Sequence, residues 1–357
     1  KITINDQNKK ILVNAQKTNI LKRLALPHAI ESAAQKEITV IAGVRRCGKS
    51  TLLMQVISAL RAAGVDTNNI LYLNFEDERL VGFGHEDFQK LNEIFLAGST
   101  GKKAYMFLDE IQNIQMWEKW ANRMYEFENV KLFVTGSNSS LLKSDVSSAL
   151  TGRSVTLYEF PLSFKELCGK MEFTTEGVGI ALAKLDQYME FGGFPEVVLG
   201  KRKDLLLVYL RDIIERDIIR RHNIRNRKRF EEFAFYIMNL YAKRFTFEKL
   251  KNIFNLGSIN TAKKFVGYIE EAFLAFSVER FSNSMSEVVR APRKLYVVDH
   301  ALSQQISNNP LQDKGAIYEN IVYLQLERAC PADEKIYYWE DYKGREVDFI
   351  IKKGETQ

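Results

Sequence analysis

Hydrophobic patterning divides the chain into two parts. Up to about residue 165, short apolar runs rich in β-branched residues alternate with stretches of helical periodicity, and beyond it the helical period prevails. Strands that alternate with helices predict a parallel sheet flanked by helices, so we expect an α/β fold followed by a mostly helical region. The predicted strands are Ile38–Ala42, Ile70–Phe75, Ala104–Leu108, Val130–Thr135 and Ser154–Tyr158.

The segment that follows the first strand fits the phosphate-loop pattern GxxxxGK[ST], and an amphipathic helix comes after it, ending near Gly64. Glycines let the backbone wrap a polyphosphate, so that its N–H groups and the helix N-terminus point at the anion. Lys49 is expected to reach the β- and γ-phosphates, and the Ser50 hydroxyl to bind Mg²⁺. The predicted nucleotide-binding residues are Gly43, Val44, Arg45, Arg46, Cys47, Gly48, Lys49, Ser50 and Thr51.

Two acids stand at the end of a predicted buried strand, Ala104–Leu108. Open α/β sheets bind ligands at the carboxyl ends of their strands, which is where Asp109 and Glu110 would lie. We predict that Asp109 holds Mg²⁺ and that Glu110 polarises the water that attacks the γ-phosphate. The alternative is a charge preference in the first turn of a helix, since Ile111–Phe127 has helical periodicity.

Polar residues also follow the strand Val130–Thr135, whose tip should lie beside Asp109. Asn138 is the predicted sensor of the attacking water or the γ-phosphate, with Ser137 as its competitor. A serine-rich helix cap is the other interpretation. Arg153 is suited to contact phosphate in its own or a neighbouring subunit, or is an ordinary solvated arginine.

Several of these strings together resemble a widespread bacterial and archaeal group of AAA+-like P-loop ATPases, and the likeness extends nearly end to end. The strings are Gly43–Thr51, Leu73–Asp77, Leu108–Asn113, Thr135–Ser139 and Phe160–Phe164. The resemblance implies ATP rather than GTP, and a sheet order in which Ile70–Phe75 lies between the two nucleotide-binding strands. It also implies a helical and winged-helix-like region and a C-terminal domain of unknown function similar to PD-(D/E)xK nucleases. The expected domains are residues 1–165, 166–285 and 286–357.

The helical region contains a basic cluster. Between Lys201 and Phe230 there are eleven basic residues against four acids. Arg220–Arg229 is suited to a phosphate backbone, and Arg216 or Arg220 is suited to reach the nucleotide as a lid arginine. A solvated helix end is the alternative. Upstream, Gly192–Pro195 is predicted to form a turn.

Phe245–Phe281 has the order helix, turn, helix, strand, which resembles a winged helix. Its second helix is predicted to begin after a Ser258 cap and to expose Asn260, Lys263 and Lys264, which suit DNA. Winged helices also dock proteins, so this likeness leaves both partners open.

The last segment has two acids in the places that a nuclease-like domain would use. Glu319 lies on a predicted helix and Asp348 on a predicted strand, and in PD-(D/E)xK nucleases such residues gather Mg²⁺. The sequence reaches Gln357 before any ExK element, so we expect an incomplete domain, and a structural or inactive version of the fold is the alternative.

Composition sets bounds on the class of protein. With 357 residues, 46% hydrophobic and 27% charged, the chain has enough apolar material for several cores. We expect no membrane span, no signal peptide and a cytoplasmic location, and three scattered cysteines favour reduced thiols over a disulfide framework. A net charge of +6 permits an anionic partner.

Together these features predict an ATPase whose bound ATP and Mg²⁺ control the position of the later domains. We expect the protein to act on DNA, and the sequence leaves homo-oligomerisation open. A nucleotide-gated signalling or scaffold switch that binds a protein is the competing hypothesis. A metal-dependent nuclease regulated by the ATPase is a third.

Overall fold

The computed structural model describes residues 2–14, 21–100, 103–137, 150–307, 314–331 and 334–352. The chain divides into two compact units, Lys1–Glu159 and Phe160–Gln357.

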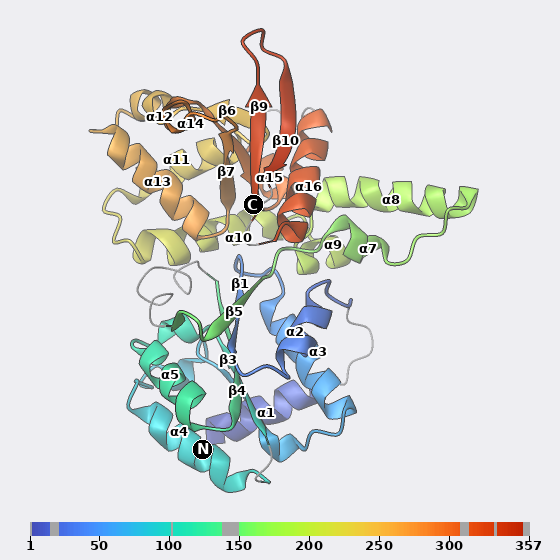
Figure 1. The fold of residues 1–357 in the computed structure, drawn as a ribbon, viewed down its shortest axis with the longest axis vertical. Coiled ribbons are helices and arrows are strands. Elements are labelled where there is room, and N and C mark those ends of the chain that lie inside the picture. Colours follow the sequence, from blue (N-terminus) through green and yellow to red (C-terminus); the bar gives the residue numbers. More distant parts are fainter. Residues whose placement is uncertain are drawn as a thin grey trace. The chain divides into compact units, whose positions relative to one another are not determined.

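The first unit is built on a five-stranded parallel sheet (Figure 1), as the sequence predicts. Every neighbouring pair of its strands runs parallel. Its strands are β1 (Ile38–Ala42), β2 (Ile70–Asn74), β3 (Ala104–Asp109), β4 (Val130–Gly136) and β5 (Ser154–Tyr158).

The strand order is β2-β3-β4-β1-β5, and it corrects one expectation. The strand between β1 and β3 is β4, whereas β2, expected there, lies at the edge beyond β3. Strand order depends on which crossover each helix makes, and local hydrophobic periodicity does not encode that choice. The tip of β4 does lie beside Asp109, as predicted, because β3 and β4 pair along their length.

Helices cover both faces of this sheet. Alternate residues of each strand point to opposite faces, so Tyr105 and Phe107 of β3 join one core while Met106 and Leu108 join the other. The first core includes residues of α1 (Ile2–Asn14), α2 (Leu26–Ser32) and α3 (Lys49–Ala62). The second includes residues of α4 (Asp87–Gly98) and α5 (Trp117–Phe127). A strand buried on both faces is held rigidly, which fixes the polar residues at its end.

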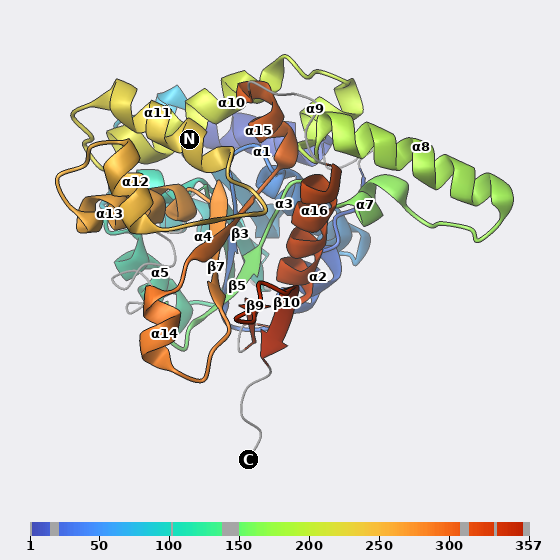
Figure 2. The same cartoon turned by 90° about the horizontal axis from the view of Figure 1, so that it is seen from above.

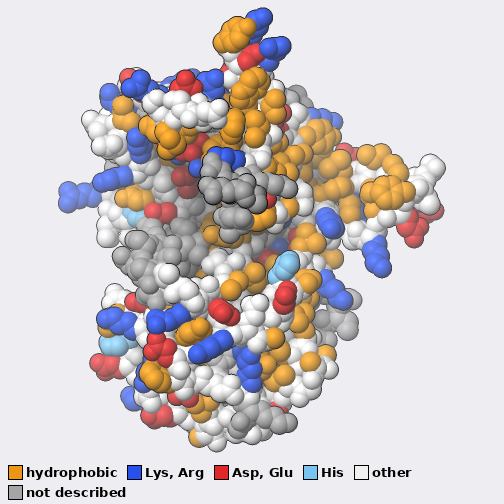
Figure 3. Space-filling view, in the orientation of Figure 1, with side chains coloured by type: hydrophobic (Ala, Val, Ile, Leu, Met, Phe, Trp, Pro, Cys, Tyr) orange, Lys and Arg blue, Asp and Glu red, His pale blue; other side chains and the backbone are white. Residues whose placement is uncertain are grey.

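The second unit is mainly helical around one mixed sheet. Its early helices are α7 (Phe164–Cys168), α8 (Thr175–Phe191), α9 (Pro195–Gly200), α10 (Leu205–Ile213), a π-helical continuation at Ile214–Arg220, and α11 (Arg227–Met238). Within this unit, α8 extends away from the other helices (Figure 2). Figure 3 shows hydrophobic side chains along it, and Val178, Ile180 and Leu182 are each about half exposed.

The predicted helix, turn, helix and strand are confirmed. Helix α12 (Phe247–Ile253) leads to α13 (Ile259–Glu271), and β7 (Ala275–Arg280) follows. The Ser258 side chain accepts a hydrogen bond from Thr261 N at 3.1 Å, which makes it the predicted cap.

One sheet joins the strands of the two later predicted domains. Its order is β10-β9-β7-β8-β6, and β9 pairs with β7 in parallel. The remaining elements are β6 (Lys243–Phe245), α14 (Met285–Arg290), β8 (Arg293–Val297), α15 (His300–Ile306), α16 (Lys314–Ala329), β9 (Lys335–Glu340) and β10 (Glu346–Lys352). Across the described ranges, no helix has the length and apolar character needed to cross a membrane.

The Gly192–Pro195 turn is explained by a buried carboxylate in the second unit. Asp299 accepts hydrogen bonds from Gly193 N at 2.7 Å, Phe194 N at 3.2 Å and Ala301 N at 2.9 Å. Gly192 has φ 73°, and a Cβ there would lie 2.1 Å from Asp299 Oδ1. Only glycine fits this position, since both the backbone conformation and the space exclude a side chain.

Candidate nucleotide-binding site

The glycine-rich segment forms a tight loop between β1 and α3. Gly48 caps the helix with φ 113°, a conformation that side-chain-bearing residues rarely adopt. A Cβ on Gly43 would lie 1.9 Å from the backbone oxygen of Glu159, so this end of the loop also requires glycine. The strand, loop and helix occur in the predicted order, and the helix N-terminus is directed at the loop that it closes.

Lys49 is buried inside the loop. Its Nζ donates to Gly43 O at 3.1 Å and to Val44 O at 3.2 Å, and lies 3.4 Å from Glu110 Oε1. Burial alone would lower the pKa of Lys49, but the nearby acidic groups, Glu110 first, together outweigh it and the pKa is raised. The side chain is therefore a fixed ammonium at the base of the loop.

Asp109 lies at the end of β3, fully buried and surrounded by hydroxyl donors. Tyr72 OH donates to its Oδ2 at 2.8 Å, and the Thr135 hydroxyl donates to its Oδ1. Ser50 also hydrogen-bonds this carboxylate. Burial raises the pKa of Asp109 and the adjacent Glu110 charge raises it further, while these hydrogen bonds act in the opposite direction.

Glu110 is oriented by Thr135 of β4 and by the turn that follows Glu110 itself. Its backbone has φ 54°, and its N–H donates to Thr135 Oγ1 at 3.0 Å. Gln112 Nε2 donates to Glu110 Oε2 at 2.5 Å and lies 3.5 Å from Ser137 Oγ. Burial would raise the pKa of Glu110, but Lys49, and then Arg45, hold it below its usual value. Glu110 is thus an ionised carboxylate facing the loop.

Behind the loop lies a buried ion pair that sequence patterns did not reveal. Arg23 Nη1 donates to Cys47 O at 2.8 Å, and Arg23 Nη2 lies 2.5 Å from Glu159 Oε1. All three side chains are nearly inaccessible, and burial raises the pKa of the Cys47 thiol to about 11. Arg23 therefore fixes a carbonyl of the loop, and Cys47 is a neutral packing residue.

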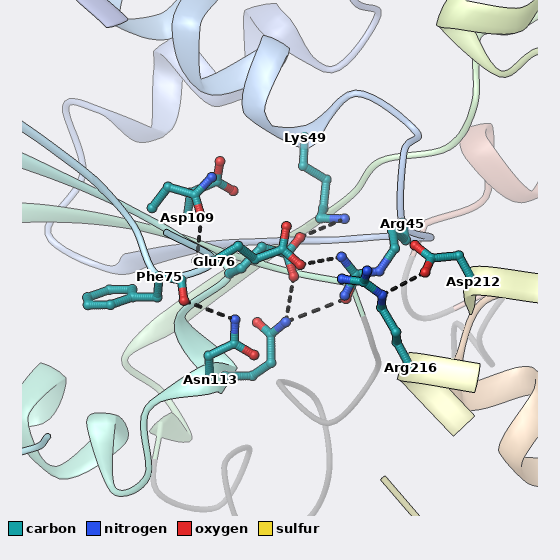
Figure 4. Close-up of polar contacts among 12 residues, drawn as sticks. Arg45, Lys49, Phe75, Glu76, Asp109, Asn113, Asp212 and Arg216 are labelled. Carbon is teal, nitrogen blue, oxygen red and sulfur yellow. Dashed lines mark hydrogen bonds and ion pairs between the residues drawn. The ribbon is translucent and has the colours of Figure 1, made fainter. Parts of the chain in front are cut away.

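The structure brings together most of the predicted loop and acidic residues at one edge of the sheet (Figure 4). Lys49, Ser50, Asp109 and Glu110 are linked by direct contacts. Of the two candidate sensors, Ser137 is buried near Glu110, and Asn138 lies outside the described residues. Thr135, Tyr72 and Gln112 were missed. Of these three, Thr135 could have been identified from the sequence, because it is a hydroxyl residue at the end of an apolar strand next to β3.

Arg153 is not among these residues. It precedes β5, and its carbonyl accepts from Ile38 N at 2.8 Å, at the start of β1 rather than at its loop end. Four residues of strand separate the two ends, or about 13 Å at ~3.3 Å per residue. Its guanidinium pairs with Glu126 at 2.6 Å. The expected phosphate contact within the same chain is therefore wrong, and such a contact would require a second copy of the chain.

The two acids expected to bind metal in the C-terminal segment do lie together, but around a lysine. Lys294 Nζ is 2.6 Å from Glu319 Oε1 and 2.8 Å from Asp348 Oδ1, and it also contacts Glu346. Tyr296 OH donates to Glu319 Oε1 at 2.6 Å. Within the described ranges, no group of three or more His, Cys, Asp or Glu side chains is arranged to hold a metal ion. The ammonium takes the place that we expected a metal to occupy.

The basic cluster of the second unit is partly neutralised. Glu215 pairs with Arg220 at 3.0 Å and with Arg227 at 2.9 Å, and Arg216 pairs with Asp212 at 2.6 Å. Arg229 donates to Asn255 O at 2.7 Å and to Phe254 O. Three arginines of the cluster Arg220–Arg229 thus have partners within this unit, and a single carboxylate, Glu215, serves two of them.

Three family models match the chain. Residues 35–168 match a family described as an AAA domain, and residues 182–313 and 314–357 match two domains of unknown function. An uncharacterized protein of Methanocaldococcus jannaschii, MJ1544, is 31% identical over 329 residues, which cover 88% of this chain and 72% of that protein. An uncharacterized protein of Haemophilus influenzae is 30% identical over 331 residues, which cover 89% of this chain and 80% of that protein.

The solved structures to which the chain is similar include the Walker-type ATPase PABY2304 of Pyrococcus abyssi and a Thermotoga maritima RuvB. The first is 14% identical with a TM-score of 0.47, covering 82% of this chain and 97% of that chain. The second is 17% identical with a TM-score of 0.36, covering 80% and 93%.

Proposed function

Since this chain belongs to the same family as these two prokaryotic relatives, and its residues 35–168 match the AAA domain, we propose that it binds Mg-ATP at Gly43–Thr51 and hydrolyses it with Glu110 as general base. The observation that carries the proposal is the position of Lys49, buried in the loop and 3.4 Å from Glu110. A cation for the phosphates and a carboxylate for the water thus share one edge of the sheet.

The residues around Asp109 fit a magnesium ion. Mg²⁺ prefers a few hard oxygen ligands plus phosphate and water, and the buried Asp109 carboxylate with the Ser50 hydroxyl supplies such a pair. Bound there, Mg²⁺ would neutralise part of the phosphate charge. Tyr72 and Thr135 fix the orientation of the Asp109 carboxylate.

The same contacts suggest how binding activates hydrolysis. Phosphate oxygens would replace Glu110 and the loop carbonyls as partners of Lys49, which leaves the Glu110 carboxylate to accept a proton from water. The water oxygen attacks the γ-phosphorus as its bond to the bridging oxygen breaks, and that oxygen keeps the electron pair, giving ADP and phosphate. Gln112 and Thr135 hold Glu110 for this step.

Steady-state phosphate release and nucleotide affinity, measured on the parent and two variants, test the proposal. Lys49→Ala should lose nucleotide binding, and Glu110→Gln should keep binding while turnover falls about 100-fold or more. Equal turnover in Glu110→Gln and the parent would show that another group is the base. Lys90→Ala, which removes an exposed charge in the first turn of α4, serves as the charge-loss control.

We further propose that the second unit acts on DNA through the α12–α13 pair, as a winged-helix-like module. The support is that Asn260, Lys263 and Lys264 of α13 are all exposed. Replacing Lys263 and Lys264 by Ala should weaken DNA binding and reduce its salt dependence. Stimulation of ATP turnover by DNA is the expected result. DNA binding that is absent even at low salt would contradict this proposal and favour a switch that binds protein.

A further inference from the structure

Arg45 is a long cation inside the phosphate loop at a position where wrapping a phosphate does not require one. Its side chain is only 13% exposed, and its guanidinium pairs with Glu76, just beyond the end of β2. Glu76 is itself held in place, because its backbone N–H donates to Asn74 Oδ1 at 2.8 Å. The loop is thus tied by an ion pair to a turn at the same edge of the sheet.

The position of Arg45 relative to the acids is informative. Arg45 lies within the loop and Lys49 begins the helix that follows it, and Figure 4 shows both side chains directed toward the acidic groups at this edge. Glu110 feels both charges, that of Lys49 first and that of Arg45 second. A group close enough to act on the proposed base is also close to the space where the terminal phosphate of ATP would lie.

We propose that Arg45 is a further catalytic residue, which exchanges Glu76 for the terminal phosphate of bound ATP and stabilises the transferring group. This inference rests on the proposed ATPase function. As the water oxygen bonds to the γ-phosphorus and the bridging bond breaks, negative charge develops on the γ-oxygens and on the leaving oxygen of ADP. Glu110 takes the water proton, and the planar guanidinium offers two parallel donors to that charge.

Glu76 has a defined part in this proposal. Its carboxylate keeps the guanidinium at the loop and partly desolvated, so that little reordering is needed when phosphate arrives. Arg45 would change partners rather than travel from solvent. Lysine at this position keeps the positive charge but loses the two parallel N–H donors of the guanidinium, so its activity should lie between those of arginine and alanine.

The test compares Arg45→Ala and Arg45→Lys with the parent in the full chain. Turnover, affinity for Mg-ATP, and affinity for ADP with aluminium fluoride, which mimics the transferring phosphoryl group, are measured for each. We expect Arg45→Ala to lower kcat about 100- to 1000-fold and to weaken the aluminium fluoride complex by a similar factor, while affinity for ATP changes less than about tenfold. Arg45→Lys should retain part of each. The control is Arg79→Ala, which removes a cation paired with Asp77, near Glu76, and should leave all three values unchanged.

The outcomes separate this inference from the proposed function. A parent that binds neither ATP nor the aluminium fluoride complex refutes the ATPase proposal itself. A parent that hydrolyses ATP, with Arg45→Ala matching Arg79→Ala, overturns only the role of Arg45. The role of Arg45 is also overturned if Arg45→Ala loses affinity for ATP and for the aluminium fluoride complex equally, because Arg45 would then be only a ground-state contact. Arg45→Lys gives the same comparison if the alanine variant does not fold.

Discussion

Thr135 is the residue on which the arrangement of both acids depends, and Thr135→Val isolates its hydroxyl. The side chain is fully buried, donates to Asp109 Oδ1 and accepts from Glu110 N at 3.0 Å. Valine has nearly the same shape, so the substitution removes two hydrogen bonds and leaves little cavity. A buried carboxylate loses a donor, and a backbone N–H loses its acceptor.

The expected cost follows from these two losses. A hydrogen bond to a charged group contributes about 1.5 to 3 kcal/mol, and an unsatisfied buried N–H costs about 1 to 3 kcal/mol, so the free energy of unfolding of the first unit should fall by about 4 kcal/mol. With a urea m-value of about 2 kcal/mol/M, the unfolding midpoint would fall by roughly 2 M.

Thr39→Val is the matched control. Thr39 is also fully buried in a central strand, but its hydroxyl donates to Ser32 Oγ at 2.9 Å, and Ser32 keeps its own bond to Ala29 O at 2.8 Å. Loss of one neutral hydrogen bond should cost about 1 kcal/mol.

The assay is urea unfolding followed by tryptophan fluorescence. Trp117 and Trp120 lie in the core of the first unit, and the third tryptophan, Trp339, lies in the second. Trp339→Phe as a common background makes the signal specific to the first unit. Equal midpoints for Thr135→Val and Thr39→Val would refute the claim that Thr135 holds the acids.

Three further predictions concern buried charges and a glycine. Burial, and then the Lys103 charge, lower the pKa of Lys131 to about 8, so the stability of the first unit should rise as pH increases from about 8 toward 10.5. Urea unfolding across this pH range should show the rise in the parent and no rise in Lys131→Met. A rise that persists in Lys131→Met would assign it to another group. Gly192→Ala should destabilise the second unit by about 3 kcal/mol or more, because the new Cβ would clash with Asp299. Gly169 has φ 69° but open space around it, so Gly169→Ala should cost only about 1 kcal/mol. Thermal unfolding compares the two variants, and equal losses of stability would show that Asp299 moves aside. Lys294→Met should cost about 3 kcal/mol, because Glu319 and Asp348 lose their cation and Glu346 keeps only Arg244, at 3.8 Å. The exposed Lys335→Met should cost under about 1 kcal/mol. Restoration of stability by Mg²⁺ would instead show that these acids can gather a metal.

Local features of the first unit were predictable from sequence because each depends on residues close together in the chain. The strand Ile38–Ala42, the glycine loop and the helix from Lys49 are one continuous pattern, and Asp109 ends a strand whose apolar run marks it as buried. The structure confirms these elements. The chemical roles of the residues remain predictions.

Features that depend on long-range pairing were not predictable in the same way. The place of β2 at the sheet edge follows from crossovers, and the partners of Asp109 come from β2 and β4, 37 and 26 residues away. The position of Arg153, in contrast, could have been predicted from the sequence. A residue that precedes a parallel strand lies at the opposite edge from residues that follow one, so Arg153 and Asp109 belong to opposite edges.

The central claim is tested most directly by calorimetric titration of the full chain with Mg-ATP, repeated with Lys49→Ala and with EDTA. The account predicts one binding site per chain in the parent, its loss in Lys49→Ala, and weakened binding when EDTA removes the metal. A parent that binds no ATP, or a Lys49→Ala variant that binds it as tightly as the parent does, would contradict the account.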